Sequence, residues 1–107
     1  MKLEELIPCE KDLLDYSAEE LADRILICLL KSTNSVPVRR RGLASRLIMG
    51  YPREFGKDSL FAIEEAIMFL EHTMLIGIDP EEREFVFITR EGKKRADCAA
   101  EKFLLPA

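Results

Sequence analysis

A chain of 107 residues with 48% hydrophobic and 34% charged residues has the composition of one globular domain rather than of a disordered segment. Its net charge is −4, and its longest apolar stretch, residues 25 to 30, is far shorter than the roughly 20 residues that a membrane-spanning helix needs. The acidic N-terminus lacks the regions of a signal peptide, so we expect a cytoplasmic protein with no membrane contact.

The cysteines and the histidine do not form a recognisable metal or disulfide pattern. Cys9, Cys28 and Cys98 are odd in number and widely spaced, and His72 is the one histidine of the sequence. We therefore expect reduced thiols, with Cys28 in the core, and no metal or other cofactor. The sequence also lacks a Gly-rich phosphate loop and a Cys or Ser beside a His in a motif context, so an enzyme is not expected.

The chain divides into an N-terminal arm, residues 1–16, and a main domain, residues 17–107. The arm carries leucines among acids and is interrupted by Pro8, which predicts a short helix from about Cys9 to Asp15 that packs on a partner or on the chain's own core. Ser17-Ala18-Glu19-Glu20 matches a capping box and predicts a helix over 17–31. The apolar residues of that helix keep helical spacing on a wide face, so it should be largely buried.

Two more helices are expected before residue 74. Val36-Pro37-Val38 suits a short strand, and apolar spacing predicts a second helix over 39–49. The Gly and Pro content of residues 50 to 57 indicates a loop, after which Asp58 or Ser59 can cap a third helix over 59–73.

A β-hairpin and a last helix complete the expected elements. Leu75 to Ile78 and Phe85 to Ile88 are strand-length runs rich in β-branched or aromatic residues, and Asp79-Pro80 between them suits a type I turn. Residues 75–88 should therefore form a hairpin. Thr89 can cap a helix over 90–103, so the chain passes from strand to helix without a loop.

The order of these elements resembles a known family. Three segments are similar to the winged helix-turn-helix family of transcription regulators, over roughly residues 17 to 104: LASRL in the second helix, FLEHTMLIGI across the third helix and the first strand, and ITREGKKRA from the end of the hairpin into the last helix. The resemblance implies an α+β, mostly helical fold with a three-helix core, a hairpin wing and a C-terminal helix, here preceded by the arm. It also implies a DNA-binding transcriptional regulator whose third helix enters the major groove of double-stranded DNA while the wing touches backbone or minor groove.

Charge points to a different part of the chain for DNA contact. Residues 58 to 73 contain four acids and no Lys or Arg, and the hairpin tip holds Arg83 alone among acids, whereas residues 39 to 57 hold six cations against Glu54, a net of +5. The expected nucleic-acid contacts are Arg39, Arg40, Arg41, Arg46, Arg53, Lys57 and Ser59. Arg39 and Arg46 are seven residues apart and would share one helix face. Lys93 to Arg95 form a second cluster. The alternative is that the arginines only solvate an exposed helix.

The third helix is apolar on more than one side, which leaves two readings. Phe61 and Phe69 can fill the single core, the reading that small domains favour. Alternatively, an outer stripe of Phe61, Glu65, Met68 and His72 binds a protein partner. The second reading gives an alternative function, a winged-helix protein-protein interaction module in a larger assembly that does not bind DNA.

Apolar residues at both chain ends predict a homodimer. The arm carries five leucine or isoleucine residues, and the C-terminus reads FLLPA. We expect these ends to pack together across a two-fold axis, which would match the palindromic half-sites of DNA readers.

Overall fold

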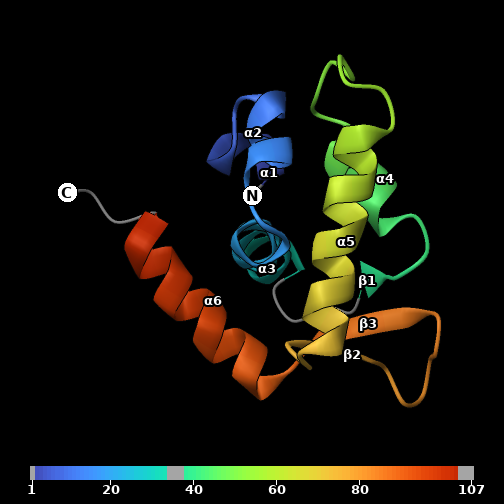
Figure 1. The fold of residues 1–107 in the computed structure, drawn as a ribbon. Coiled ribbons are helices and arrows are strands. Elements are labelled where there is room, and N and C mark those ends of the chain that lie inside the picture. Colours follow the sequence, from blue (N-terminus) through green and yellow to red (C-terminus); the bar gives the residue numbers. More distant parts are fainter. Residues whose placement is uncertain (1, 34–37, 104–107) are drawn as a thin grey trace.

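Helix α3 (Ala18–Thr33) lies at the centre of the molecule, and in Figure 1 it is seen end-on. The computed structural model describes residues 2–33 and 38–103 as an α+β, mostly helical domain with a small antiparallel sheet. The other helices are α1 (Leu3–Leu6), α2 (Glu10–Asp15), α4 (Leu43–Ile48), α5 (Asp58–His72) and α6 (Arg90–Phe103), and the strands are β1 (Val38–Arg39), β2 (Ile76–Ile78) and β3 (Phe85–Ile88). Helices α5 and α6 flank α3 on two sides and make its most extensive contacts. Among the described residues, no helix is both long and apolar enough to cross a bilayer.

The start and the central position of α3 follow from its sequence. The Ser17 N–H donates to Glu20 Oε1 at 3.1 Å and the Glu20 N–H donates to Ser17 Oγ at 3.2 Å, so the predicted capping box is present. All five residues from Ile25 to Leu29 are buried. A helix that is apolar nearly all round must be covered nearly all round, and α3 is covered by α1, α5 and α6. The prediction of a largely buried helix is confirmed.

The N-terminal arm packs on the chain's own core. Leu3, Ile7 and Leu13 are at most 1% exposed, and the Tyr51 hydroxyl donates to the Ile7 carbonyl at 2.6 Å. Helix α2 confirms the predicted short helix, while the single turn α1 was not predicted. Because these apolar side chains are used within the chain, the arm gives little support to the predicted homodimer. The C-terminal leucines, residues 104 and 105, lie outside the described residues.

The second helix begins four residues later than predicted, at Leu43 instead of residue 39. Arg39 belongs to strand β1, opposite Phe85 of β3, and the next N–H, that of Arg40, donates to the Glu84 carbonyl at 2.9 Å. Pairing with β3 therefore fixes this segment in an extended form, and the helix starts only after Gly42 with its φ of 81°. The prediction that Arg39 and Arg46 share a helix face is wrong. The predicted strand at 36 to 38 is described only at its last residue.

The predicted hairpin is present and gains a third strand. Strand β3 lies between β1 and β2, both antiparallel to it. At the turn, Asp79 Oδ1 accepts the backbone N–H groups of Glu81 and Glu82 at 2.8 and 3.2 Å, and at the start of α6 the Thr89 hydroxyl accepts the Gly92 N–H at 3.0 Å. The predicted cap is confirmed. In the hairpin connection the backbone turn bond runs from the Phe85 N–H to the Glu82 carbonyl, while Asp79 contributes through its side chain. The sheet and α6 thus begin where short-range signals place them.

Candidate nucleic-acid interface

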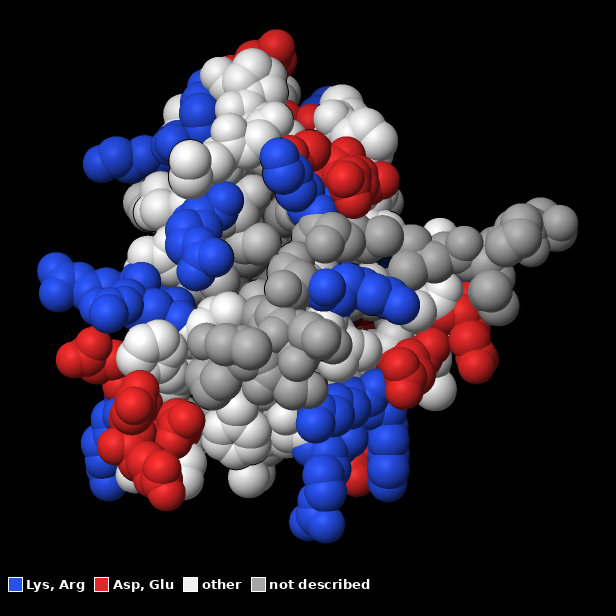
Figure 2. All heavy atoms as spheres, turned by 180° about the vertical axis from the view of Figure 1, so that it is seen from behind, with Lys and Arg blue, Asp and Glu red and all other residues white. Residues whose placement is uncertain are grey.

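Four exposed cations form what we call the basic edge, defined as Arg41, Arg46, Arg53 and Lys57. They come from the turn before α4, from α4 itself and from the loop that leads to α5. Helix α4 buries Leu43, Ala44 and Ile48, which leaves its polar residues on the outside. Among the described residues, none of the four forms an ion pair with a carboxylate. Figure 2 shows Lys and Arg side chains gathered along this side of the molecule, with acidic side chains at the hairpin end below them.

Arg40 has a different environment from the basic edge. Its Nη2 lies 2.7 Å from Glu64 Oε2 and 3.0 Å from Glu71 Oε1, and its side chain is 23% exposed. Hydrogen bonds to Glu64 and then Glu71 raise the pKa of Arg40, so the guanidinium stays charged. These contacts tie the turn before α4 to α5. Arg40 was predicted to contact nucleic acid, but its donors are directed to α5 carboxylates instead.

Ser59 is also placed differently from its prediction. It is fully buried, at 0% exposure, and its hydroxyl donates to Glu10 Oε2 at 2.8 Å. Neither Asp58 nor Ser59 is the N-cap of α5, which is Lys57. A buried hydroxyl that already donates to a carboxylate does not reach a phosphate, so the predicted contact at Ser59 does not fit the structure.

Glu10 holds the loop of the basic edge in place. Besides the Ser59 hydroxyl it accepts the backbone N–H groups of Glu54 and Phe55 at 3.1 and 3.4 Å. Burial by itself would raise the pKa of Glu10, but these hydrogen bonds outweigh it and hold the pKa below its ordinary value of 4.5. The role of Glu10 is not visible in the sequence, because nothing local distinguishes one acid of the arm from the next.

Arg39 is the last of the predicted contacts and remains on the surface. Its Nη1 lies 3.4 Å from Glu84 Oε2, and the two side chains are 59% and 72% exposed. An ion pair this exposed is worth little in water and exchanges readily for another partner. Arg39 is therefore accessible, but it belongs to the sheet and not to α4.

Helix α5 exposes apolar side chains on the face that looks away from α3. Phe61 and Met68 are each 54% exposed, and Glu65 and His72 lie exposed on the same side. We call these four residues the outer stripe. The favoured reading of Phe61 as a core residue is wrong, whereas Phe69 is partly buried against the core. The outer stripe has no Lys or Arg, so its chemistry differs from that of the basic edge.

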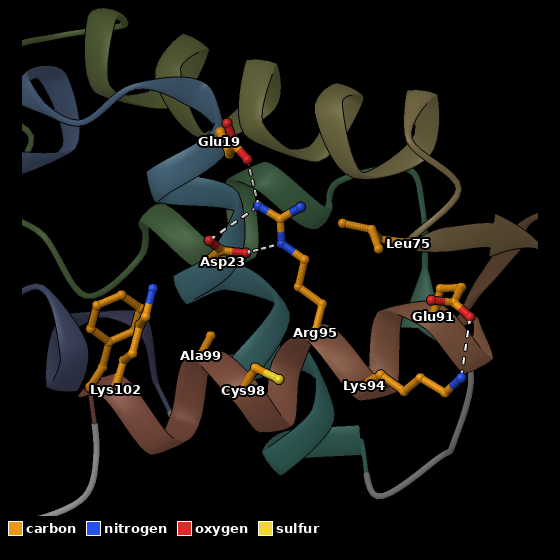
Figure 3. A pocket seen from close by; sticks show the side chains of 10 residues that line it. Glu19, Asp23, Leu75, Glu91, Lys94, Arg95, Cys98, Ala99 and Lys102 are labelled. Carbon is orange, nitrogen blue, oxygen red and sulfur yellow. Dashed lines mark hydrogen bonds and ion pairs between the residues drawn. The ribbon is translucent and has the colours of Figure 1, made fainter.

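A groove of about 630 Å³ lies between α3 and α6. Arg95 reaches across it, with Nε 2.7 Å from Asp23 Oδ1 and Nη2 2.8 Å from Glu19 Oε1 (Figure 3). These hydrogen bonds, first to Asp23 and then to Glu19, raise the pKa of Arg95. Lys94 pairs with Glu91 at 3.4 Å. Of the second predicted cationic cluster, Arg95 is therefore held by carboxylates of α3 and holds α6 against α3, whereas Lys93 and Lys94 remain exposed.

Comparisons of the chain with protein-family models, with curated proteins and with solved structures find no significant match. Within residues 2–33 and 38–103, no cluster of His, Cys, Asp and Glu side chains has the arrangement needed to hold a metal ion.

Proposed function

We propose that the protein is a DNA-binding transcriptional regulator of the winged helix-turn-helix type that holds the phosphates of double-stranded DNA with its basic edge. The order of α3, α4, α5, hairpin and α6 supports the winged-helix assignment. The observation that carries the proposal is the basic edge itself. Its four exposed cations form no ion pair with a carboxylate of residues 2–33 and 38–103, although the net charge of the chain is −4.

The acids of α5 oppose this docking less than their number suggests. Glu64 and Glu71 each lie within 3.0 Å of the Arg40 guanidinium, which offsets part of their charge. Asp58 and Glu65 remain exposed. The DNA backbone therefore meets cations from α4 and the following loop, while α5 stays shallow in the groove because Glu65 repels phosphate at its centre.

The test is the salt dependence of duplex binding. Replacing Arg41, Arg46 and Arg53 with Ala should weaken binding strongly at about 50 mM salt and make the plot of log affinity against log salt shallower by up to about three units, since each phosphate contact contributes about 0.9. The variant should fold normally, because exposed substitutions change stability by no more than about 0.5 kcal/mol.

A matched control removes the same charge elsewhere. Lys11, Lys31 and Lys102 are exposed residues outside the basic edge, and their replacement with Ala also lowers the net charge by three. This variant should keep the wild-type slope to within about one unit. Equal losses in the two triple variants, or no duplex binding by the wild type at about 50 mM salt, would refute the proposal.

A second function is favoured by one observation, the outer stripe. Solvent-exposed Phe and Met on one helix face are residue types enriched in the cores of protein interfaces. If the protein is a winged-helix interaction module in a larger assembly, Phe61→Ala with Met68→Ala abolishes capture of its protein partner. The same double variant leaves duplex binding unchanged if the basic edge alone contacts DNA, so the two functions are separable.

A further inference from the structure

The outer face of the sheet carries aromatic side chains that the core does not use. Cross-strand partners point to the same face, and β3 alternates so that Val86 is buried while Phe85 and Phe87 point outward. Phe87 is 40% exposed. Arg39, directly opposite Phe85, holds its guanidinium carbon 5.4 Å from the centre of that ring. Two neighbouring rings and an exposed cation therefore share one surface on the two adjacent strands.

Gly77 of β2 shapes this surface. It lies opposite Phe87, and two ring carbons of Phe87 lie 3.1 and 3.2 Å from the position that a Cβ at residue 77 would occupy. The ring thus rests over the glycine, and a larger residue would displace it. Covering a glycine with an aromatic ring stabilises a sheet by itself. Because Phe87 remains 40% exposed, the ring also faces solvent.

We propose that this face is a stacking platform for the unpaired bases of a single-stranded nucleic acid. Phe85 and Phe87 stack on bases, and Arg39 and Arg41 contact the phosphates of the same strand. Aromatic side chains flanked by cations on an antiparallel sheet suit single strands, because every base has a stacking face. The site extends the proposed function and rests on it in one respect, since the strand continues from the platform toward Arg41 of the basic edge.

The spacing of the rings favours a single strand over a duplex. Residues two apart on a strand are about 7 Å apart, roughly twice the spacing of about 3.4 Å between successive bases of one duplex strand. Bases that occupy both rings must therefore be pulled out of the continuous stack. A duplex presents its bases stacked and paired, with only their edges accessible.

The charges around the platform determine the path of the bound nucleic-acid strand. Glu84 already pairs with Arg39 at 3.4 Å and competes with a phosphate there, although both side chains are exposed. Glu81 and Glu82 at the hairpin tip are also exposed and repel phosphate. The Arg40 N–H donates to the Glu84 carbonyl, so Arg41 lies at the same end of the sheet as the hairpin turn, but on the β1 side of β3. The nucleic-acid strand is therefore expected to leave the platform over β1 toward Arg41, and not over β2, which leads into the acidic hairpin turn.

The test uses the absence of tryptophan from the sequence. In Phe87→Trp the new indole is the only one in the chain, and stacking of a base on it quenches its fluorescence. We expect quenching by single strands of about 12 nucleotides, thymidylate or uridylate, within the site sizes of known single-strand binders. Phe61→Trp, on the outer stripe, is the matched control and should show no quenching. The DNA and RNA arms identify which sugar is preferred.

A second variant separates stacking from folding. Phe87→Leu keeps an apolar cover over Gly77 but removes the ring, so its urea midpoint should stay near the wild-type value while single-strand affinity falls about tenfold. Glu84→Gln should strengthen binding by freeing Arg39. Unquenched Phe87→Trp, or single-strand affinity unchanged in Phe87→Leu, overturns the platform.

The outcomes distinguish this inference from the proposed function. Duplex binding that depends on Arg41 and Arg46, with no quenching of Phe87→Trp, retains the regulator and rejects the platform. If the wild type does not bind duplex, and quenching of Phe87→Trp persists when Arg46 and Arg53 are replaced, the platform is retained and the regulator is rejected. Absence of both signals at about 50 mM salt rejects both.

Discussion

Arg40 and Arg41 are adjacent in sequence, and we predict that their replacement affects different properties. Replacing Arg40 should lower the stability of the fold, and replacing Arg41 should weaken DNA binding. In Arg40→Met the carboxylates of Glu64 and Glu71 lose the guanidinium that lies within 3.0 Å of both. Breaking a fully buried ion pair costs about 3–5 kcal/mol. The two acids are 38% and 30% exposed, so water compensates part of the loss and we expect about 2 kcal/mol. For a domain of this size that corresponds to a melting point lowered by about 8 °C.

The assay is urea unfolding followed by circular dichroism, with duplex binding measured on the same samples. Arg40→Met should unfold at lower urea but keep the wild-type salt slope, because its donors face α5 and not the solvent. Arg41→Met should unfold like the wild type and lose about one unit of slope. Adding Glu64→Gln and Glu71→Gln to Arg40→Met should restore part of the stability, since it removes the repulsion between the two carboxylates.

Two results would refute this reasoning. Equal urea midpoints for Arg40→Met and Arg41→Met would mean that the contacts to α5 contribute no net stability. A salt slope lowered as much by Arg40→Met as by Arg41→Met would mean that Arg40 releases the α5 carboxylates to bind phosphate, and that α5 then faces the DNA with its acids unpaired.

Three further predictions concern groups that are fixed by packing. Gly92→Ala should lower the free energy of unfolding, measured by urea unfolding, by about 3 kcal/mol, because the new Cβ meets the Leu75 carbonyl oxygen. In Gly50→Ala the new Cβ meets only the flexible Glu4 carboxylate, so the free energy of unfolding should fall by less. Because its pKa is lowered in the fold, ionised Glu10 stabilises the protein at pH values above its ordinary pKa of 4.5. The wild type should therefore have a higher free energy of unfolding than Glu10→Gln at neutral pH, and this difference should vanish as the pH falls through the lowered pKa. A thiol reagent should label the two exposed cysteines of the native protein and reach Cys28, whose pKa burial raises to about 12, only after unfolding.

The features that sequence predicted well are those decided within a few residues. The capping box of α3 needs only Ser17 and Glu20, and the start of α6 needs only Thr89 and the N–H three residues later. The hairpin likewise follows from two apolar runs and Asp79 at its turn. In each case the partners are too close in sequence for tertiary packing to redirect them.

The features that sequence missed depend on partners far along the chain. Residues 39 and 40 are extended because β3 lies beside them, although apolar spacing alone favours a helix there. The buried Ser59 hydroxyl donates to Glu10, 49 residues away in sequence. Arg40 donates to Glu64 and Glu71, which are 24 and 31 residues away. Local pattern does not say which of many acids will face a given cation, so the sequence yields the charge of the segment but not which of its charges are accessible.

The accessible charges determine how the two proposed functions relate. The basic edge and the outer stripe share no residue. Arg40 links the turn before α4 to α5, and its Nη1 and Nη2 donate to α5 carboxylates. Substitutions in the two surfaces should therefore act additively on binding, as expected for sites without shared partners. We predict that the triple variant of the basic edge and the double variant Phe61→Ala with Met68→Ala, combined in one chain, lose duplex binding and partner capture by the same factors as each variant alone. A combined loss that differs from the product of the separate factors would show that one ligand spans both surfaces, because only then does removing one surface change what the other contributes.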